Sequence, residues 1–104
     1  MQVVLTVEAL PEAPLAASAA VFERHLEEAE TMLAGEGVTA LAIVLPRAGT
    51  DHDDWRLALA RDLARGHAPE RVNVVGGGDA AARKETLAYL ADAPGITGQY
   101  IPLA

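Results

Sequence analysis

The sequence predicts a single α/β domain in which a mostly parallel sheet is covered by helices on both faces. Short β-branched and apolar runs alternate along the 104 residues with longer stretches rich in Ala, Glu and Arg, which is the pattern of repeated strand–helix units. The apolar runs are continuous and do not alternate with polar residues, as expected for parallel strands buried on both faces. A chain of this length holds one core, so we expect one domain over residues 1–104.

Four strands are expected, near residues 2–7, 40–45, 72–76 and 99–103. The first two are the clearest, because Val3 to Val7 and Ala40 to Leu45 are uninterrupted apolar runs apart from Thr6. The last two are shorter versions of the same pattern.

The first of three expected helices lies near residues 17–34. Its apolar residues recur at spacings of three and four, which is the period of a helix with one buried face. Gly35 and Gly37 follow it and are typical of a helix end. The recurring positions include Val21, Phe22, His25, Leu26, Ala29, Met32 and Leu33.

The other two helices are expected near residues 51–65 and 79–91. Thr50 or Asp51 is expected to cap the second helix, whose buried face would carry Trp55, Leu59 and Leu63, with Ala58 and Asp62 alongside. Asp79 is expected to cap the third helix, which would end before Pro94 and Gly95. Asp53 and Asp54 follow the expected cap of the second helix, and their negative charges favour a helix start through the helix dipole.

Composition and charge exclude several classes of protein. The formal net charge is −7, from 15 acidic and 8 basic residues, and a surface of that sign repels nucleic acid and anionic lipid. There is no cysteine, which fits a reducing compartment. The N-terminus does not resemble a signal peptide, and the longest apolar run, Ala40 to Leu45, is far below the roughly 20 residues that span a bilayer. We therefore expect a soluble, cytoplasmic protein.

The second half of the chain resembles the short-chain dehydrogenase/reductase family. Residues 57–64 (Leu-Ala-Leu-Ala-Arg-Asp-Leu-Ala) are similar to part of the helix that carries that family's catalytic pair. Arg71-Val72-Asn73 and the glycines at 76–78 resemble the next strand and its loop, and residues 86–92 and 96–103 resemble the closing helix, the Thr-Gly-Gln turn and the last strand. The resemblance implies the outer half of a doubly wound, Rossmann-like sheet, truncated before the cofactor-binding strands.

The family's functional residues do not carry over. No Gly-rich dinucleotide motif occurs, and residues 8–12 and 46–49 stand where the family has Asn-Asn-Ala-Gly and the catalytic serine. Counting back from the matched helix, the Tyr and Lys of the catalytic pair would fall near Leu45 and Gly49, and neither residue can donate a proton. The expectation is a pseudoenzyme with no catalytic residue and no cofactor.

Two remaining groups of residues could bind a metal or an anion. Residues 51–54 (Asp-His-Asp-Asp) contain metal-ligand types, but adjacent residues at a helix start diverge, so capping and dipole compensation explain them and no metal is expected. An enzyme built on them would lack a paired acid and base in separate environments. Gly76, Gly77 and Gly78, ahead of Asp79, are weak candidates for binding an anionic cofactor at a helix start. A turn-and-cap role competes with that reading.

The sequence then favours an assembly protein. A first strand without its family neighbour would leave an open edge, and the family pairs through helices equivalent to the expected helices 17–34 and 51–65, which are rich in Ala here. We expect a homodimer, or a heteromer with a full-length dehydrogenase, through these two helices. The alternative is a module that binds a small ligand or nucleotide at the strand ends near Leu45–Thr50 and Gly76–Asp79.

Overall fold

The computed structural model describes all 104 residues and contains one four-stranded sheet. Its strands are β1 (Gln2–Thr6), β2 (Ala40–Leu45), β3 (Arg71–Gly77) and β4 (Tyr100–Leu103). They lie in the order β1-β2-β3-β4, and every neighbouring pair is parallel. The four expected strands and the parallel sheet are confirmed.

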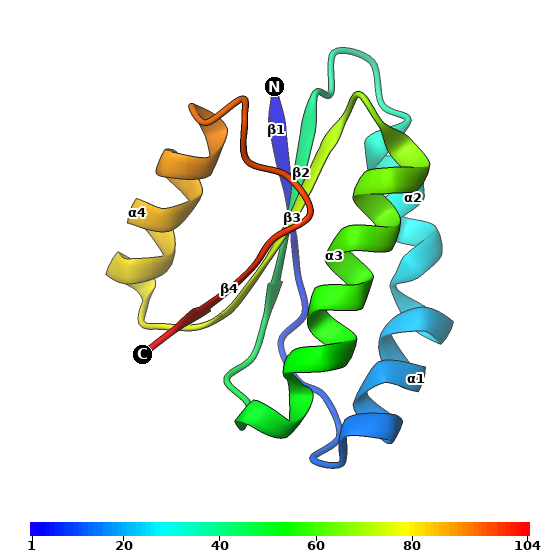
Figure 1. Ribbon diagram of the computed structural model, residues 1–104, viewed down its shortest axis with the longest axis vertical. Helices are drawn as coiled ribbons and strands as arrows, with labels where there is room; N and C mark the ends of the chain where they lie inside the picture. Colours follow the sequence, from blue (N-terminus) through cyan, green and yellow to red (C-terminus); the bar gives the residue numbers. More distant parts are fainter.

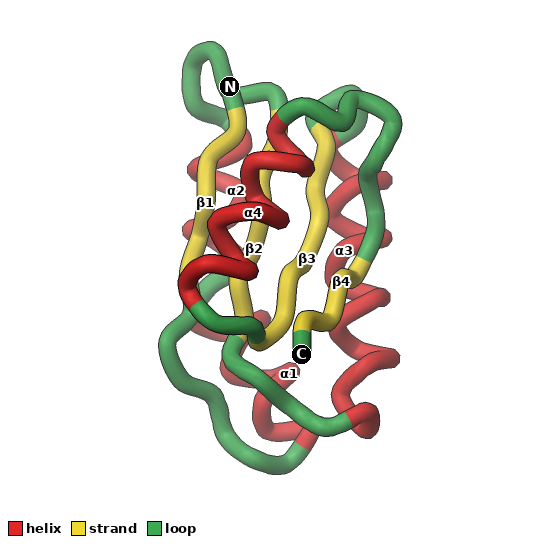
Figure 2. Tube along the Cα trace, turned by 90° about the vertical axis from the view of Figure 1, so that its left-hand side faces the viewer, coloured by secondary structure: helices red, strands yellow, loops and turns green.

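Helices cover both faces of this sheet, so the domain has three layers (Figure 1). Helices α1 (Pro14–Arg24), α2 (Leu26–Leu33) and α3 (Asp53–His67) lie on one face, and α4 (Ala80–Ala91) lies on the other. Figure 2 shows α4 crossing in front of β1 and β2. None of the helices combines the length and the hydrophobicity needed to cross a bilayer.

The first helical region differs in detail from the expectation of one helix near residues 17–34. It begins earlier, because Pro14 occupies the first turn of α1, where its fixed φ and missing N–H suit a helix start. It also consists of two helices, with His25 between them at φ −119° and ψ −17°. No Pro or Gly marks this break in the sequence.

The larger part of the core lies between the sheet and helices α1 to α3. Alternate residues of a strand face opposite sides, and the odd-numbered residues of β2 belong to a cluster of 13 buried side chains with residues of α1, α2 and α3. Val44 of β2 instead packs with Val75 and Leu90 on the side of α4. The face under α1, α2 and α3 therefore supplies most of the hydrophobic stabilisation.

The connection from β3 to β4 has the opposite hand to the two connections before it. The strand order advances in one direction, but α4 lies on the other face from α1, α2 and α3 (Figures 1 and 2). Parallel crossovers are nearly all of one hand, so this one requires specific support.

Arg71 and Asn73 supply that support, and this explains the Arg-Val-Asn motif. Arg71 Nη1 donates hydrogen bonds to the carbonyl oxygens of Leu90, Ala93 and Ile96, at the end of α4 and beyond it. The buried Asn73 side chain donates to the Ile96 carbonyl at 3.0 Å and accepts from the Gln99 amide at 3.1 Å. The two side chains thus fasten the segment that leads from α4 into β4.

Candidate functional site

A groove of about 770 Å³ opens at the carboxyl ends of β1 and β2. Open parallel α/β sheets bind ligands in crevices of this kind. The loop after β1, the loop after β2 and the beginning of α3 form its walls. The lining residues are Glu8, Ala9, Leu10, Pro11, Glu12, Pro46, Arg47, Ala48, Gly49, Asp51, His52 and Arg56.

His52 ties the loop after β1 to the beginning of α3. The Trp55 indole Nε1 donates to His52 Nδ1 at 3.0 Å, and His52 Nε2 lies 2.9 Å from the Glu12 carbonyl oxygen. An indole nitrogen only donates, so Nδ1 must be the acceptor and Nε2 carries the proton that is donated to Glu12. The buried imidazole is therefore held as one neutral tautomer with both nitrogens engaged.

Arg56 is the other buried residue of the groove, and its guanidinium is almost without partners. The residue is 1% exposed, and its one hydrogen bond runs from Nη1 to the hydroxyl oxygen of Tyr100 at 3.3 Å. Its Nε is buried without a hydrogen-bond partner. No carboxylate oxygen lies within 4.0 Å of its nitrogens. A buried charge is normally paired, so this arrangement is unusual.

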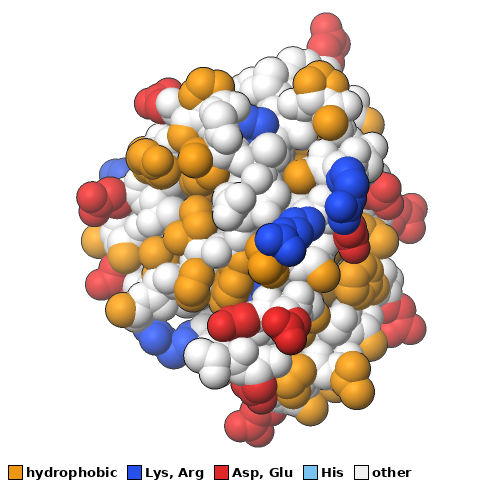
Figure 3. Space-filling model, viewed as in Figure 1, with side chains coloured by type: hydrophobic (Ala, Val, Ile, Leu, Met, Phe, Trp, Pro, Cys, Tyr) orange, Lys and Arg blue, Asp and Glu red, His pale blue; other side chains and the backbone are white.

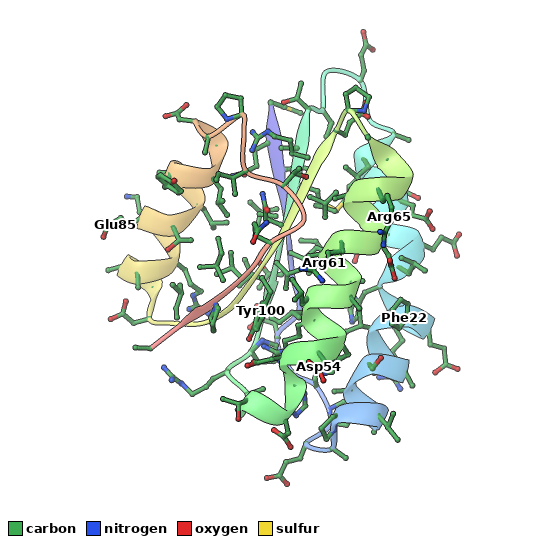
Figure 4. All side chains as sticks on the ribbon, viewed as in Figure 1. Phe22, Asp54, Arg61, Arg65, Glu85 and Tyr100 are labelled. Carbon is green, nitrogen blue, oxygen red and sulfur yellow. The ribbon has the colours of Figure 1, made fainter.

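Aromatic rings flank the Arg56 guanidinium in place of a counter-ion. Its central carbon lies 5.3 Å from the centre of the Trp55 ring and 5.8 Å from that of Tyr100, distances at which a cation is attracted to a ring face. Tyr100, labelled in Figure 4, extends from β4 toward α3. The guanidinium has five N–H donors, and the hydrogen bond from Nη1 to Tyr100 uses one of them.

Gly76 makes this arrangement possible. A Cβ at this position would lie 2.6 Å from the Tyr100 hydroxyl oxygen and 2.8 Å from Arg56 Nη1, closer than such atoms approach. The first glycine of the run therefore creates the space that the guanidinium and the phenol occupy.

The rest of the glycine run packs against the end of the sheet. Gly77 and Gly78 have φ of +71° and +77°, a region that favours glycine, and both lie against Leu103. Asp79 caps α4 as expected, since its carboxylate accepts a hydrogen bond from the Ala82 amide at 2.8 Å. The structure thus gives each of the three glycines a packing or turn role.

The exposed part of the groove carries charges of both signs. Glu8, Glu12 and Asp51 are exposed carboxylates and Arg47 is an exposed cation. Figure 3 shows the same mixture on the face it presents, with basic and acidic side chains interspersed among hydrophobic ones.

Two sequence expectations about α3 are wrong. Neither Thr50 nor Asp51 caps the helix: a short 3-10 turn over Thr50–His52 precedes it, and no side chain accepts a hydrogen bond at its start. Asp53 and Asp54 do lie in the first turn. The chain contains no cluster of three His, Asp or Glu side chains arranged around a metal position.

The buried face of α3 was predicted only in part: Leu59 and Leu63 are buried as expected and Trp55 packs against the core. Arg56, Leu59, Ala60 and Leu63 are buried, whereas Ala58 and Asp62, expected on that face, are exposed. The signal was present in the spacing, because positions 56, 59, 60 and 63 follow a helical stripe. A charged residue on such a stripe is assumed to face solvent, so Arg56 was missed.

Leu45 and Gly49, near which the resemblance to the family leads us to expect its catalytic pair, lie at or near the groove. Leu45 is fully buried at the end of β2, and Gly49 is part of the loop that lines the groove. Tyr100 contacts Arg56, while Tyr89 and Lys84 lie on α4.

The parallel sheet, its two helical layers and the crevice at the carboxyl ends of its strands define a Rossmann-like α/β domain. Comparison with protein families finds a match to the SDR-like family, described as short chain dehydrogenase-like protein, over residues 5–103. The chain therefore belongs to this family, as the motifs around Arg71 to Asn73 and in the closing segment imply. No curated protein and no solved structure is found that matches it.

Proposed function

We propose that the protein is a non-catalytic member of its family and acts by association through the outer surface of α1, α2 and α3. The partner is a second copy of the chain or a full-length dehydrogenase of the same family. The observation that carries the proposal is a partly apolar depression on this helical layer, lined by four hydrophobic residues and by Glu30, Asp62, Gly66 and His67.

This depression has a volume of about 310 Å³ and lies between the pair α1 and α2 and the neighbouring α3. Its apolar lining comes from Phe22, Leu26, Leu59 and Leu63. Phe22 is 45% exposed and is seen in Figure 4 on the side of α1 away from the sheet. An exposed aromatic beside a partly apolar depression is the type of contact that anchors interfaces.

A two-fold dimer would use this surface twice, because each copy offers both a projecting ring and a depression. Fully burying an exposed Phe side chain contributes roughly 1.5–3 kcal/mol. Phe22 is already about half buried, so each copy would gain about half of that value, and a symmetric contact would bury two such rings. Small exposed residues such as Ala19 and Ala58 would let the helices of two copies approach closely.

A non-catalytic role is supported by the residues at the family's reacting positions. Leu45 and Gly49 stand where the Tyr and Lys would act, and neither side chain can supply a proton. The buried polar groups of the groove, His52 and Arg56, are not arranged as an acid and a base, because both nitrogens of His52 are already engaged.

Sedimentation equilibrium of the purified protein tests the homodimer, and co-purification from its native host tests the heteromer. Phe22→Glu is expected to abolish the association. Tyr89→Glu is the matched control, because Tyr89 is an equally large ring, 62% exposed, on the opposite face of the sheet. A wild-type monomer in both experiments, or equal effects of the two substitutions, contradicts the proposal.

A further inference from the structure

The groove at the ends of β1 and β2 has a feature that association through the helices does not use. Arg56 lines it, is almost completely buried, and lacks any carboxylate partner within the protein. Burying an ion is costly unless it is paired, and a buried polar group without a partner calls for an explanation such as a bound ion or ligand.

The other buried side chain of the groove, His52, cannot serve as a ligand-binding group in the same way. Its two ring nitrogens are bonded to Trp55 and to the Glu12 carbonyl. Arg56 is thus the buried group of the groove with unused hydrogen-bonding capacity, since Nη1 alone has a partner, at a long 3.3 Å. A planar guanidinium suits an oxyanion, to which it donates two parallel hydrogen bonds.

We propose that the groove binds a small oxyanion-bearing molecule, a carboxylate or a phosphate, with the anionic group held by Arg56. Arg47, exposed on the loop after β2, adds a second positive charge at the same groove. The anion supplies the counter-charge that the folded chain does not provide.

The exposed carboxylates restrict what the rest of the ligand is. Glu8, Glu12 and Asp51 line the same groove, and they repel further negative charge. The remainder of the molecule therefore carries hydroxyl or amino groups, which donate hydrogen bonds to these carboxylates. This arrangement disfavours polyanions such as nucleoside triphosphates.

The protein contains its own reporter for this site. Trp55 is its sole tryptophan, and its ring lies 5.3 Å from the Arg56 guanidinium. An anion drawn to Arg56 changes the electric field at that indole, so binding is expected to change the intrinsic tryptophan fluorescence.

The test titrates the full chain with inorganic phosphate, acetate and glycine, with sodium chloride at matched ionic strength as the reference. We expect a saturable change in Trp55 fluorescence with phosphate or acetate. The anion that binds more tightly shows whether the natural ligand carries a phosphate or a carboxylate group. Glycine is expected to bind more tightly than acetate, because its amino group meets the carboxylates. Arg56→Met is expected to weaken binding at least tenfold.

Arg61→Met is the matched control, because Arg61 is exposed on the same helix (Figure 4), and it is expected to bind like the wild type. Arg56→Lys keeps the positive charge but lacks the planar guanidinium that donates two parallel hydrogen bonds, so it is expected to bind with intermediate affinity. This variant replaces Arg56→Met if Arg56→Met does not fold. The proposal is overturned if no anion gives a saturable change, or if the Arg56 variants bind as tightly as the wild type. If glycine binds no more tightly than acetate, the groove carboxylates do not bind the amino group of the ligand, and that part of the proposal is overturned. These outcomes are independent of the sedimentation experiment, so failure of one proposal does not decide the other.

Discussion

Replacing Arg56 by methionine is predicted to make the protein more stable. Methionine is unbranched and flexible, so it can fill the space along Trp55 and Tyr100 left by the arginine stem. The substitution removes a buried ion whose effective desolvation cost is several kcal/mol. In a buried ion pair the partner charge offsets at least part of that cost, but here no carboxylate lies within 4.0 Å.

The compensating interactions that are lost are limited. One hydrogen bond to a charged group contributes about 1.5–3 kcal/mol at good geometry, and the bond to Tyr100 is long at 3.3 Å. The two ring contacts are close to the roughly 6 Å limit of this attraction, at 5.3 and 5.8 Å, so each adds only about 0.5 kcal/mol. We therefore expect the free energy of unfolding to rise by about 1 kcal/mol, which corresponds to an increase in Tm of roughly 4–8 °C for a domain of this size.

Thermal and denaturant unfolding followed by circular dichroism would measure this change, with Arg61→Met expected to stay within about 0.5 kcal/mol of the wild type. Phosphate or acetate should raise the Tm of the wild type but not that of Arg56→Met, because a ligand stabilises only a state that binds it. A loss of about 3 kcal/mol or more in Arg56→Met would refute the reasoning. It would mean that the guanidinium is a structural group whose contacts outweigh its burial.

Other substitutions test the remaining parts of the account by denaturant unfolding. Asn73→Ala leaves the Gln99 amide without a partner and removes one of the two donors to the Ile96 carbonyl, and it is expected to cost about 2 kcal/mol; an unchanged midpoint would contradict the supporting role of Asn73 in the last crossover. His52→Ala removes two buried hydrogen bonds, to Trp55 and to the Glu12 carbonyl, and is expected to lower the free energy of unfolding by about 2 kcal/mol. It is also expected to shift Trp55 fluorescence, so an unaltered spectrum would contradict the hydrogen bond between His52 and Trp55. Gly77→Ala is expected to cost at least about 1–2 kcal/mol because φ is +71°. Its control, Gly66→Ala in α3 with open space around the site, should instead stabilise by about 0.5–1 kcal/mol; the same sign for both would refute the conformational argument.

The strands could be predicted closely because each is a short apolar run that is buried as soon as the sheet forms. Ala40–Leu45 has the same bounds in the sequence and in the structure, and every residue of it is buried. The helices were less well defined, since their ends depend on local hydrogen bonds. The start of α3 is an example: residues 50–52 form a 3-10 turn where a side-chain cap was expected.

The groove was only partly accessible to sequence reasoning. The general rule for open sheets correctly indicates the carboxyl ends of the strands and the loop after Leu45. The decisive residue, Arg56, was missed because its burial depends on Gly76 and Tyr100, which are 20 and 44 positions away in the sequence. The burial of an arginine by residues so distant in the sequence cannot be predicted from the periodicity of α3 alone.

The strand order has a consequence for how the chain folds. Each strand pairs with the one that precedes it in the sequence, so no strand has to wait for, or insert between, strands made later. Folding from the N-terminus during synthesis can therefore add one strand–helix unit at a time. The contacts within each pair are nevertheless distant, as Gln2 beside Ala40 and Ala40 beside Arg71 illustrate, and such separations slow folding. While β3 and α4 are still being synthesised, β2 is a second open edge of almost wholly apolar residues, and this is the stage at which the chain is most prone to aggregate.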